Sequence, residues 1–328
     1  MRLIIAMIII NMALLFVSPQ VEAKGRYTAT TSGAFLKIDI GARTVAMGGA
    51  GGALIGDPIC VYYNPAGLAG LGTFSLSSSH LEWFQDIKCE HLGLAKRLKV
   101  GFEEEARDLG VGAFNLNFLH MNKIQGTHLL GESNWEKADE WTASGYNAIL
   151  TYACYFSRDA LFGINFKVIQ ERIEKEAATA VAFDLGVLYR TRIKNLVAGV
   201  SLQNMGNEMK FMEEKASLPL NLKGSMGYAM LNNEFRLLID INQPIDNELH
   251  VRAGAEYWII PCLSLRAGYN SSVDTVDRGA ASSGFGGGLG LKLKRQGEEK
   301  TTIYKFDYAF VPYGEVGDSH RVSVAVEF

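Results

Sequence analysis

The sequence has no strong excess of charge of either sign. Lys and Arg number 32 and Asp and Glu number 35, which gives a formal net charge of -3, and no basic stripe indicates a nucleic-acid partner. Cysteine is scarce, and its four copies show neither a CxxC pair nor a histidine at ligand spacing, so no zinc site is expected. Export would permit a disulfide, but spacing alone does not pair the cysteines. We expect buried free thiols at Cys60, Cys89, Cys154 and Cys262.

Motifs for catalysis and for cofactor binding are also missing. The chain contains no G-x-x-x-x-G-K-[ST] phosphate loop and no G-x-S-x-G nucleophile turn. Its 6 histidines stand in no recognised nucleophile context. The acidic run Glu103–Glu105 is explained better by a solvated turn than by a calcium site. The sequence therefore predicts a protein that is not an enzyme and that uses no cofactor or metal.

Long hydrophobic runs are absent after residue 23. The first residues combine Arg2, an apolar run from Leu3 to Val17 and the small-residue site Val21-Glu22-Ala23, which is typical of a secretory signal peptide removed after Ala23. The alternative is an N-terminal membrane anchor, for which this run is short. We expect residues 1–23 to be a signal peptide, and no transmembrane helix is predicted in the rest of the chain.

What the sequence has instead is alternation of polar and apolar residues from about residue 73 to its end. Successive side chains of a strand point to opposite sides of the sheet, and about fourteen segments alternate over roughly the 9–11 residues that a tilted transmembrane strand needs. Aromatic residues recur near the segment ends, as in membrane-interface girdles. A soluble β-sandwich is the alternative, but its strands would be shorter than these segments, and the number of segments here is high and even.

We therefore predict an all-β fold, a transmembrane antiparallel β-barrel of about 14 strands over residues 73–328. The preceding Gly- and Ala-rich segment, residues 24–72, differs in composition from the strands, and we call it the hatch because the family resemblance given below implies that it folds into the barrel lumen. Charged residues on the less apolar strand faces would then point inward. They would either bind the headgroup of a solute or hold the hatch in place. These candidate lumen charges are Lys223, Asp240, Arg252, Glu256, Arg266 and Asp307.

The chain closes on the strand pattern HRVSVAVEF, residues 320–328, in which the valines and Phe328 share one face. An open sheet edge within lipid leaves backbone groups unsatisfied, so the last strand of a barrel must pair with the first. The pattern therefore predicts that this terminus is a closing strand.

The hatch contains GARTVAMGGAGGALIGDPICVYYNPAGLAGL, residues 41–71. Without a phosphate-binding frame, its small residues favour close packing of backbone against backbone. We expect a short helix over 42–54 and a turn at 64–67, where Asn caps, Pro fixes φ and Gly can take positive φ. The residues proposed as the hatch motif are Gly48, Gly49, Asp57, Asn64, Pro65 and Gly67.

With NPAGL in the hatch and the closing FDYAFVPYGEVGDSHR, the mature chain resembles the PorV/PorQ proteins of the FadL-like superfamily of bacterial outer-membrane barrels. Nearly the whole mature chain fits this resemblance. It implies a fourteen-stranded barrel with a lumenal hatch that passes hydrophobic molecules across the outer membrane. It also implies contact with outer-membrane lipids and with the barrel assembly machinery, which would recognise Phe328 as its signal. The motif match extends to Asn64, Pro65 and Gly67 but to no ligand contact.

The same resemblance implies an alternative function, a non-enzymatic component of a type IX-like secretion or envelope complex that binds secreted cargo proteins. The segment KIQGTHLLGESNWEKADEW, residues 123–141, is the candidate partner-binding loop, because it is polar, contains two tryptophans and is long for an ordinary hairpin. The other interpretation of this segment is a solvated loop without a partner.

Overall fold

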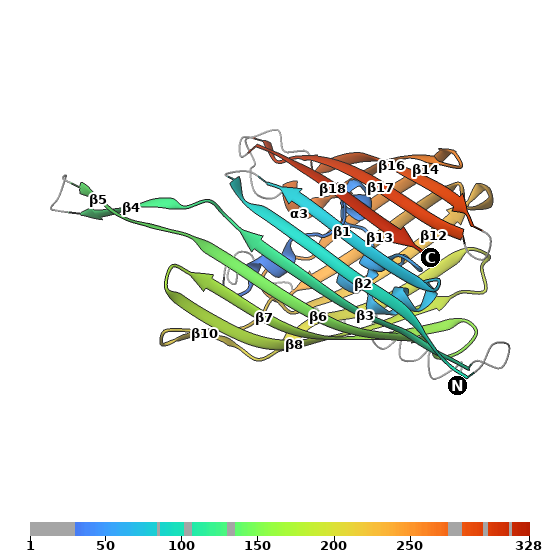
Figure 1. Cartoon of the computed structure of the whole chain (residues 1–328), viewed down its shortest axis with the longest axis horizontal. Helices are drawn as coiled ribbons and strands as arrows, with labels where there is room; N and C mark the ends of the chain where they lie inside the picture. The colour runs from blue at the N-terminus through green and yellow to red at the C-terminus, as the bar shows by residue number, and fades with distance from the viewer. Residues whose placement is uncertain are drawn as a thin grey trace.

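The computed structural model describes residues 30–83, 86–101, 107–129, 135–274, 284–297, 301–314 and 317–328. The expected signal peptide, residues 1–23, and the acidic run at 103–105 lie outside the described residues. Fourteen strands form one closed barrel in the order β1-β18-β17-β16-β15-β14-β13-β12-β9-β8-β7-β6-β3-β2 (Figure 1), and every neighbouring pair is antiparallel. This arrangement confirms the predicted fold class.

The barrel strands follow one another along the chain, with short additional elements between some of them. Their bounds are β1 Phe74–Glu82, β2 Lys88–Val100, β3 Arg107–His120, β6 Ala143–Tyr155, β7 Ala160–Ile173, β8 Glu176–Arg190, β9 Leu196–Gly206, β12 Asn221–Met230, β13 Phe235–Pro244, β14 His250–Ile260, β15 Leu263–Asn270, β16 Phe285–Gln296, β17 Thr301–Pro312 and β18 Asp318–Glu327.

The two faces of the barrel wall reverse the usual pattern of a soluble protein. In β12, Lys223 is 2% exposed, whereas Met226 is 52% exposed on the outer surface. Leu92 of β2, at 60% exposed, and Leu150 of β6, also at 60%, are further examples of large apolar side chains that face outward. An apolar exterior around a polar lumen is the pattern of barrels that span a membrane. Among the described residues, no helix has the length and apolar character to cross a membrane.

The last strand closes the barrel against the first. β18 pairs with β1 from Ser75 opposite Glu327 to Glu82 opposite His320. Beyond the strand end, the Phe328 amide donates a hydrogen bond to the carbonyl of Phe74 at 2.9 Å, and the two rings lie 5.7 Å apart. The last strand is therefore hydrogen-bonded to β1 up to Phe328, and the barrel wall has no unpaired strand edge.

The two ends of the barrel differ. At the end where β18 finishes, which we call the turn end, consecutive strands such as β6 and β7 or β14 and β15 are joined by short turns, one of them containing the 3₁₀ helix η6 Leu231–Asn233. The opposite end, the loop end, carries the longer connections. These contain the hairpins β4 Ile124–Leu129 with β5 Trp135–Trp141 and β10 Met209–Phe211 with β11 Glu214–Ala216, and the short helix α3 Ser271–Asp274.

The segment 123–141 was expected to be a loop but contains a β-hairpin. Ile124 pairs with Trp141, and the ribbon continues the direction of β3 and β6 far beyond the barrel (Figure 1). Trp135 and Trp141 are the two end residues of β5. Tryptophan favours β-strands, so both residues support strand pairing up to the ends of β5. The polar composition that suggested a loop reflects a ribbon with solvent on both faces.

The hatch contributes four short helical elements within the lumen: η1 Ala34–Lys37, α2 Ala42–Ala46, η2 Pro58–Tyr62 and η3 Pro65–Gly70. The helix expected over 42–54 is wrong in its length, because α2 ends at Ala46. Gly48 and Gly49 follow with φ of 68° and 77°, a left-handed conformation that ends an α-helix and that glycine adopts without strain.

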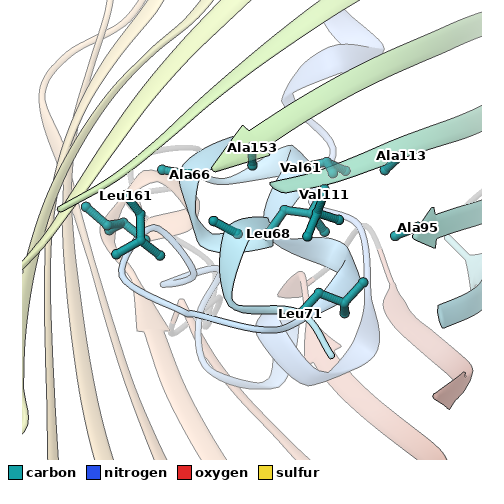
Figure 2. Packing of buried hydrophobic residues seen from close by; sticks show 11 residues of the cluster. Val61, Ala66, Leu68, Leu71, Ala95, Val111, Ala113, Ala153 and Leu161 are labelled. Carbon is teal, nitrogen blue, oxygen red and sulfur yellow. The ribbon is translucent and has the colours of Figure 1, made fainter. Parts of the chain in front are cut away.

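Small barrel residues make room for the hatch. Leu68 and Leu71 of the hatch pack against Ala95, Val111 and Ala113 of the wall, as Figure 2 shows. Alanine and glycine at inward positions bring the wall backbone close to the hatch, and the result is a continuous buried apolar cluster. Such packing stabilises the hatch mainly through removal of apolar surface from water.

None of the four cysteines forms a disulfide. Cys60 and Cys89 are buried, and Cys154 and Cys262 are half-buried. Burial is the main cause that raises the pKa of the Cys60 thiol to about 12, so this thiol stays protonated and unreactive at neutral pH.

Candidate functional site

The Asn64 side chain fixes one end of the hatch to the wall. Its Oδ1 accepts a hydrogen bond from the Ala66 amide at 3.1 Å and so caps η3, in which Pro65 occupies the first position. Its Nδ2 donates to the carbonyls of Val187 and Val200, at 3.2 and 3.3 Å. One side chain therefore caps a hatch element and holds it against β8 and β9.

Two glycines of the proposed hatch motif allow close backbone approach. A Cβ atom at Gly48 would lie 2.5 Å from the Tyr269 carbonyl oxygen of β15. At Gly67 it would lie 2.2 Å from the carbonyl oxygen of Leu54. Neither backbone oxygen can move aside as a flexible side chain could. Glycine is therefore required at these positions by the space between hatch, wall and neighbouring turns.

Asp240 of β13 receives the glycine-rich turn of the hatch. Its Oδ2 accepts hydrogen bonds from the amides of Gly51 and Gly52, both at 3.0 Å, and the carboxylate is 0% exposed. Successive backbone N–H groups directed at one anion form a small concave nest. The barrel wall thus supplies the anion, and the hatch supplies the donors.

A chain of alternating charges joins the hatch to β14, β15 and β17. Arg43 of α2 contacts Asp57 at 2.7 Å and Glu256 at 2.6 Å. Arg266 contacts the same Glu256 at 2.9 Å and Asp307 at 2.6 Å. Each cation lies between two carboxylates, which offsets the desolvation of charges that are almost fully buried.

Asp57 lies within the hatch at the end of this chain. Burial alone would raise its pKa, but the charges of Arg43 and Lys305 and a hydrogen bond from the Ile59 amide together hold the pKa below its usual range. The Asp57 carboxylate therefore stays ionised, and the ion pair with Arg43 persists well below neutral pH.

The remaining two candidate lumen charges differ from each other. Arg252 forms an ion pair with Asp39 of the hatch at 2.7 Å. Lys223 lies under the face of the Tyr63 ring, with its ammonium 5.0 Å from the ring centre. The structure therefore brings five of the six charges into ion pairs or hydrogen bonds that involve the hatch or its neighbours, and it leaves Lys223 apart.

Several residues at this site did not emerge from the sequence. Arg43 and Asp39 of the hatch are the partners of the wall charges, and Lys167 pairs with Asp184 in the lumen at 2.7 Å. One signal was present for Arg43, since it is an isolated cation in a segment of small residues. The partner of an inward-facing charge, however, depends on which strands the closed barrel places opposite the hatch.

A buried Ser77–His91–Asn117 set lies beside the hatch. The Ser77 hydroxyl is 3.2 Å from Nε2 of His91, and Nδ1 of His91 is 3.2 Å from the Asn117 amide oxygen and 3.0 Å from the Tyr62 hydroxyl. The first three side chains are 4%, 3% and 7% exposed, and Ser77 is not among the residues that line the two cavities described next. The contact with Tyr62 indicates that His91 binds the hatch. Among the described residues, no group of three or more His, Cys, Asp or Glu could hold a metal ion.

Two cavities lie on opposite sides of the hatch. The loop-end cavity, about 170 Å³, is lined from the hatch by residues 35–40, Tyr62 and Tyr63. The turn-end cavity, about 520 Å³, is lined from the hatch by Arg43, Ile55 and Gly56. No residue lines both cavities. The hatch thus contributes residues to two distinct spaces, one toward each end of the barrel.

No protein-family model and no curated protein matches the sequence. Solved structures do match the fold. The toluene transporter TbuX of Ralstonia pickettii shares 12% identity with a TM-score of 0.54, over 88% of this chain and 97% of that one. A FadL homologue of Pseudomonas aeruginosa shares 10% identity with a TM-score of 0.52, over 88% of this chain and 98% of that one. The P. putida toluene transporter TodX shares 12% identity with a TM-score of 0.52, over 88% and 96%. At these identities the similarity lies in the architecture, and this chain has the fold of the FadL-like barrels.

Proposed function

We propose that this protein resides in the bacterial outer membrane and passes a small, largely apolar solute through its lumen, with the hatch as the gate. The observation that carries this proposal is the pair of cavities that the hatch lines, one toward each end of a closed barrel. In bacterial outer-membrane barrels the short turns face the periplasm and the longer loops face outward. The loop-end cavity would then receive the solute, and the turn-end cavity would release it.

The size and part of the lining of the loop-end cavity support a small apolar solute. Phe35, Leu36, Ile38 and Ile40 of the hatch line it, and its volume is about 170 Å³. A protein cavity of roughly 150 Å³ is large enough for benzene. The solved neighbours TbuX and TodX are named as toluene transporters, which is consistent with a solute of this size.

A reversible covalent link between hatch and wall tests whether the hatch is the gate. The ideal Cβ of Gly227 in β12 would lie 3.1 Å from the Cβ of Ala53, close to the roughly 3.5–4.5 Å that a disulfide needs. The double variant Ala53→Cys/Gly227→Cys should form a disulfide on oxidation. In proteoliposomes, oxidation should stop toluene uptake, and a reducing agent should restore it.

The matched controls are the two single variants and the wild type under the same oxidant, since the four native cysteines are unpaired. Their uptake should be unaffected by oxidation. Equal uptake by the oxidised and reduced double variant, once mass spectrometry has verified the link, would refute a gate formed by the hatch. Uptake no faster than in protein-free vesicles would refute the transport function.

The β4–β5 hairpin favours a second function, the cargo-binding component of a secretion or envelope complex of the PorV/PorQ type. This hairpin forms a two-stranded sheet of its own, and Trp135 is 64% exposed. An isolated two-stranded ribbon is marginally stable in water, so a partner strand or surface would stabilise it. The sequence resemblance to PorV/PorQ proteins supports the same function.

Replacement of residues 123–141 by a short Gly-Ser turn tests this second function, because the deletion leaves the fourteen barrel strands intact. Secreted or envelope proteins that co-purify with the full chain from native membranes should be lost from the shortened chain. Trp135→Ser is the finer variant and should weaken the same association. An unchanged set of co-purifying proteins in both variants would remove the hairpin from consideration as a partner site.

A further inference from the structure

Lys223 is the exception among the charges of the lumen. Its side chain is 2% exposed, and its ammonium forms no ion pair or hydrogen bond within the described part of the chain. The other buried cations nearby are compensated, since Lys167 lies 2.7 Å from Asp184 and Arg252 lies 2.7 Å from Asp39. Burial of a charge is unfavourable unless the charge is paired. The Lys223 ammonium lies over the Tyr63 ring and is attracted by Asp240 and Asp39 without a direct ion pair, so it is open to an anionic partner.

Unpartnered polar atoms surround the same position. Asn242, directly opposite Lys223 in the β12–β13 register, is 1% exposed, and its Nδ2 has no hydrogen-bond partner. The Nε of Arg252 is also buried without a partner. Both residues line the loop-end cavity together with Lys223. Asn147 and Asn221, which line the same cavity, each leave an Oδ1 acceptor unpartnered. Buried polar atoms are nearly always hydrogen-bonded, so the group that completes the two donors of Asn242 and Arg252 must be an acceptor.

The same cavity also has apolar lining. Phe35, Leu36 and Ile38 of the hatch and Pro219 and Pro244 of the wall line it. A ligand that matches both the charged and the apolar parts of this lining has an apolar body about the size of one aromatic ring. Its other end is negatively charged and rich in hydrogen-bond acceptors. A plain hydrocarbon would fill the volume but leave the ammonium and both donors unsatisfied.

The turn-end cavity carries charge of the same sign. Lys292 and Lys294 line it and form no ion pair among the described residues, and Arg236 has only a 3.7 Å contact, to Glu256. Glu234 and Asp307 also line this cavity, but they are outnumbered by its cations, Arg43, Arg236, Arg266, Lys292, Lys294 and Lys305. An excess of one sign of charge raises the local concentration of the opposite ion, so an anion that crossed the hatch would meet a net attraction on the other side.

We propose that the loop-end cavity binds a small organic acid, with its carboxylate at the Lys223 ammonium and the Asn242 and Arg252 donors, and with its apolar body against Phe35 and Ile38. This inference rests on the proposed transport function and narrows its solute class from apolar molecules in general to ring-sized organic anions. The anion accepts hydrogen bonds from the buried donors, and the apolar body packs against the hatch.

Calorimetry on the full chain in detergent tests the site apart from transport, with benzoate, benzyl alcohol and toluene as probes of one size. Benzoate should bind most tightly. Lys223→Met keeps the length of the side chain and removes its charge, and it should weaken benzoate binding by about tenfold or more, the loss expected when a hydrogen bond to a charged group is removed. Lys223→Arg should retain binding. Asn242→Leu should weaken benzoate severalfold, and it provides a second test if Lys223→Met does not fold.

The matched control is Lys175→Met, which removes an exposed cation from the β7–β8 turn and should leave benzoate binding unchanged. Equal affinity for benzoate and benzyl alcohol, or unchanged benzoate affinity in both Lys223→Met and Asn242→Leu, would overturn the inference. Uptake into proteoliposomes separates it from the proposed function. Benzoate that binds through Lys223 but never crosses the membrane leaves the site standing and refutes transport. Toluene uptake without benzoate binding supports transport and refutes the organic-acid site.

Discussion

The contact between Asp240 and the glycine turn of the hatch provides a sharp test of how the hatch is held. Asp240→Ala removes the carboxylate that accepts the Gly51 and Gly52 amides and leaves the apolar contacts of Leu68 and Leu71 untouched. The expected result is local release of the turn within a barrel that still folds. The fourteen-stranded hydrogen-bond ladder does not depend on this side chain.

The size of the effect follows from the two N–H groups that lose their acceptor. A buried donor left unsatisfied costs about 1–3 kcal/mol, which gives roughly 2–6 kcal/mol for the pair, and water that enters the space of the lost carboxylate favours the lower limit. About 2 kcal/mol corresponds to a ~30-fold rise in the population of the open turn. Asp240→Asn keeps one acceptor oxygen and should fall between the wild type and Asp240→Ala.

Hydrogen exchange with mass spectrometry measures this opening directly. Peptides that cover residues 41–54 should exchange faster in Asp240→Ala, by about the same ~30-fold factor, whereas peptides from β1 and β18 should not change. Glu248→Ala, which removes an exposed acid from the neighbouring β13–β14 connection, is the control and should show wild-type exchange throughout. Unchanged exchange over 41–54 in Asp240→Ala would refute the assignment of Asp240 as a hatch anchor, and faster exchange of the whole barrel would show that its role is global.

Four further predictions concern the hatch and the closing strand. Leu68→Ala, at a site that is 0% exposed, should lower the free energy of unfolding by about 2–5 kcal/mol, measured by urea titration of the refolded barrel. Gly48→Ala, whose Cβ would lie 2.5 Å from the Tyr269 carbonyl oxygen, should destabilise by at least ~1–2 kcal/mol, while Gly72→Ala, where a Cβ meets nothing within 4 Å, should be neutral. The lowered pKa of Asp57 means that its stabilising ion pair is complete above its ordinary value of 3.8 and is lost as pH falls through the lower folded pKa. The protection of the hatch amides, which is their exchange rate corrected for the intrinsic pH dependence of exchange, should therefore stay constant from neutral pH to about pH 4, and an earlier loss of protection would contradict the assignment. Phe328→Ala, which removes the ring 5.7 Å from that of Phe74, should reduce the fraction of heat-modifiable folded barrel on gels, with Val326→Ala as a milder comparison.

The strands could be predicted because their signal is local. A period of two along the chain assigns each side chain to one face, so the inward position of Lys223 or Glu256 follows from its neighbours in sequence. Asn64 was also readable, since an Asn before Pro at the start of a helical turn caps it through its own side chain. The hatch helix was overestimated because its small residues favour a helix, while the helix ends where Gly48, at positive φ, packs against the backbone of β15.

Sequence alone determined the barrel, the number of its strands and the faces of their side chains, because alternation and strand length are properties of consecutive residues. Only the tertiary structure decided which lumen charges meet. Arg43 and Glu256 are 213 residues apart along the chain, as are Asp39 and Arg252, and no local pattern relates such positions. Closure of the sheet and the seating of the hatch bring them together, and the same two events leave Lys223 beside the loop-end cavity without an ion pair of its own among the described residues.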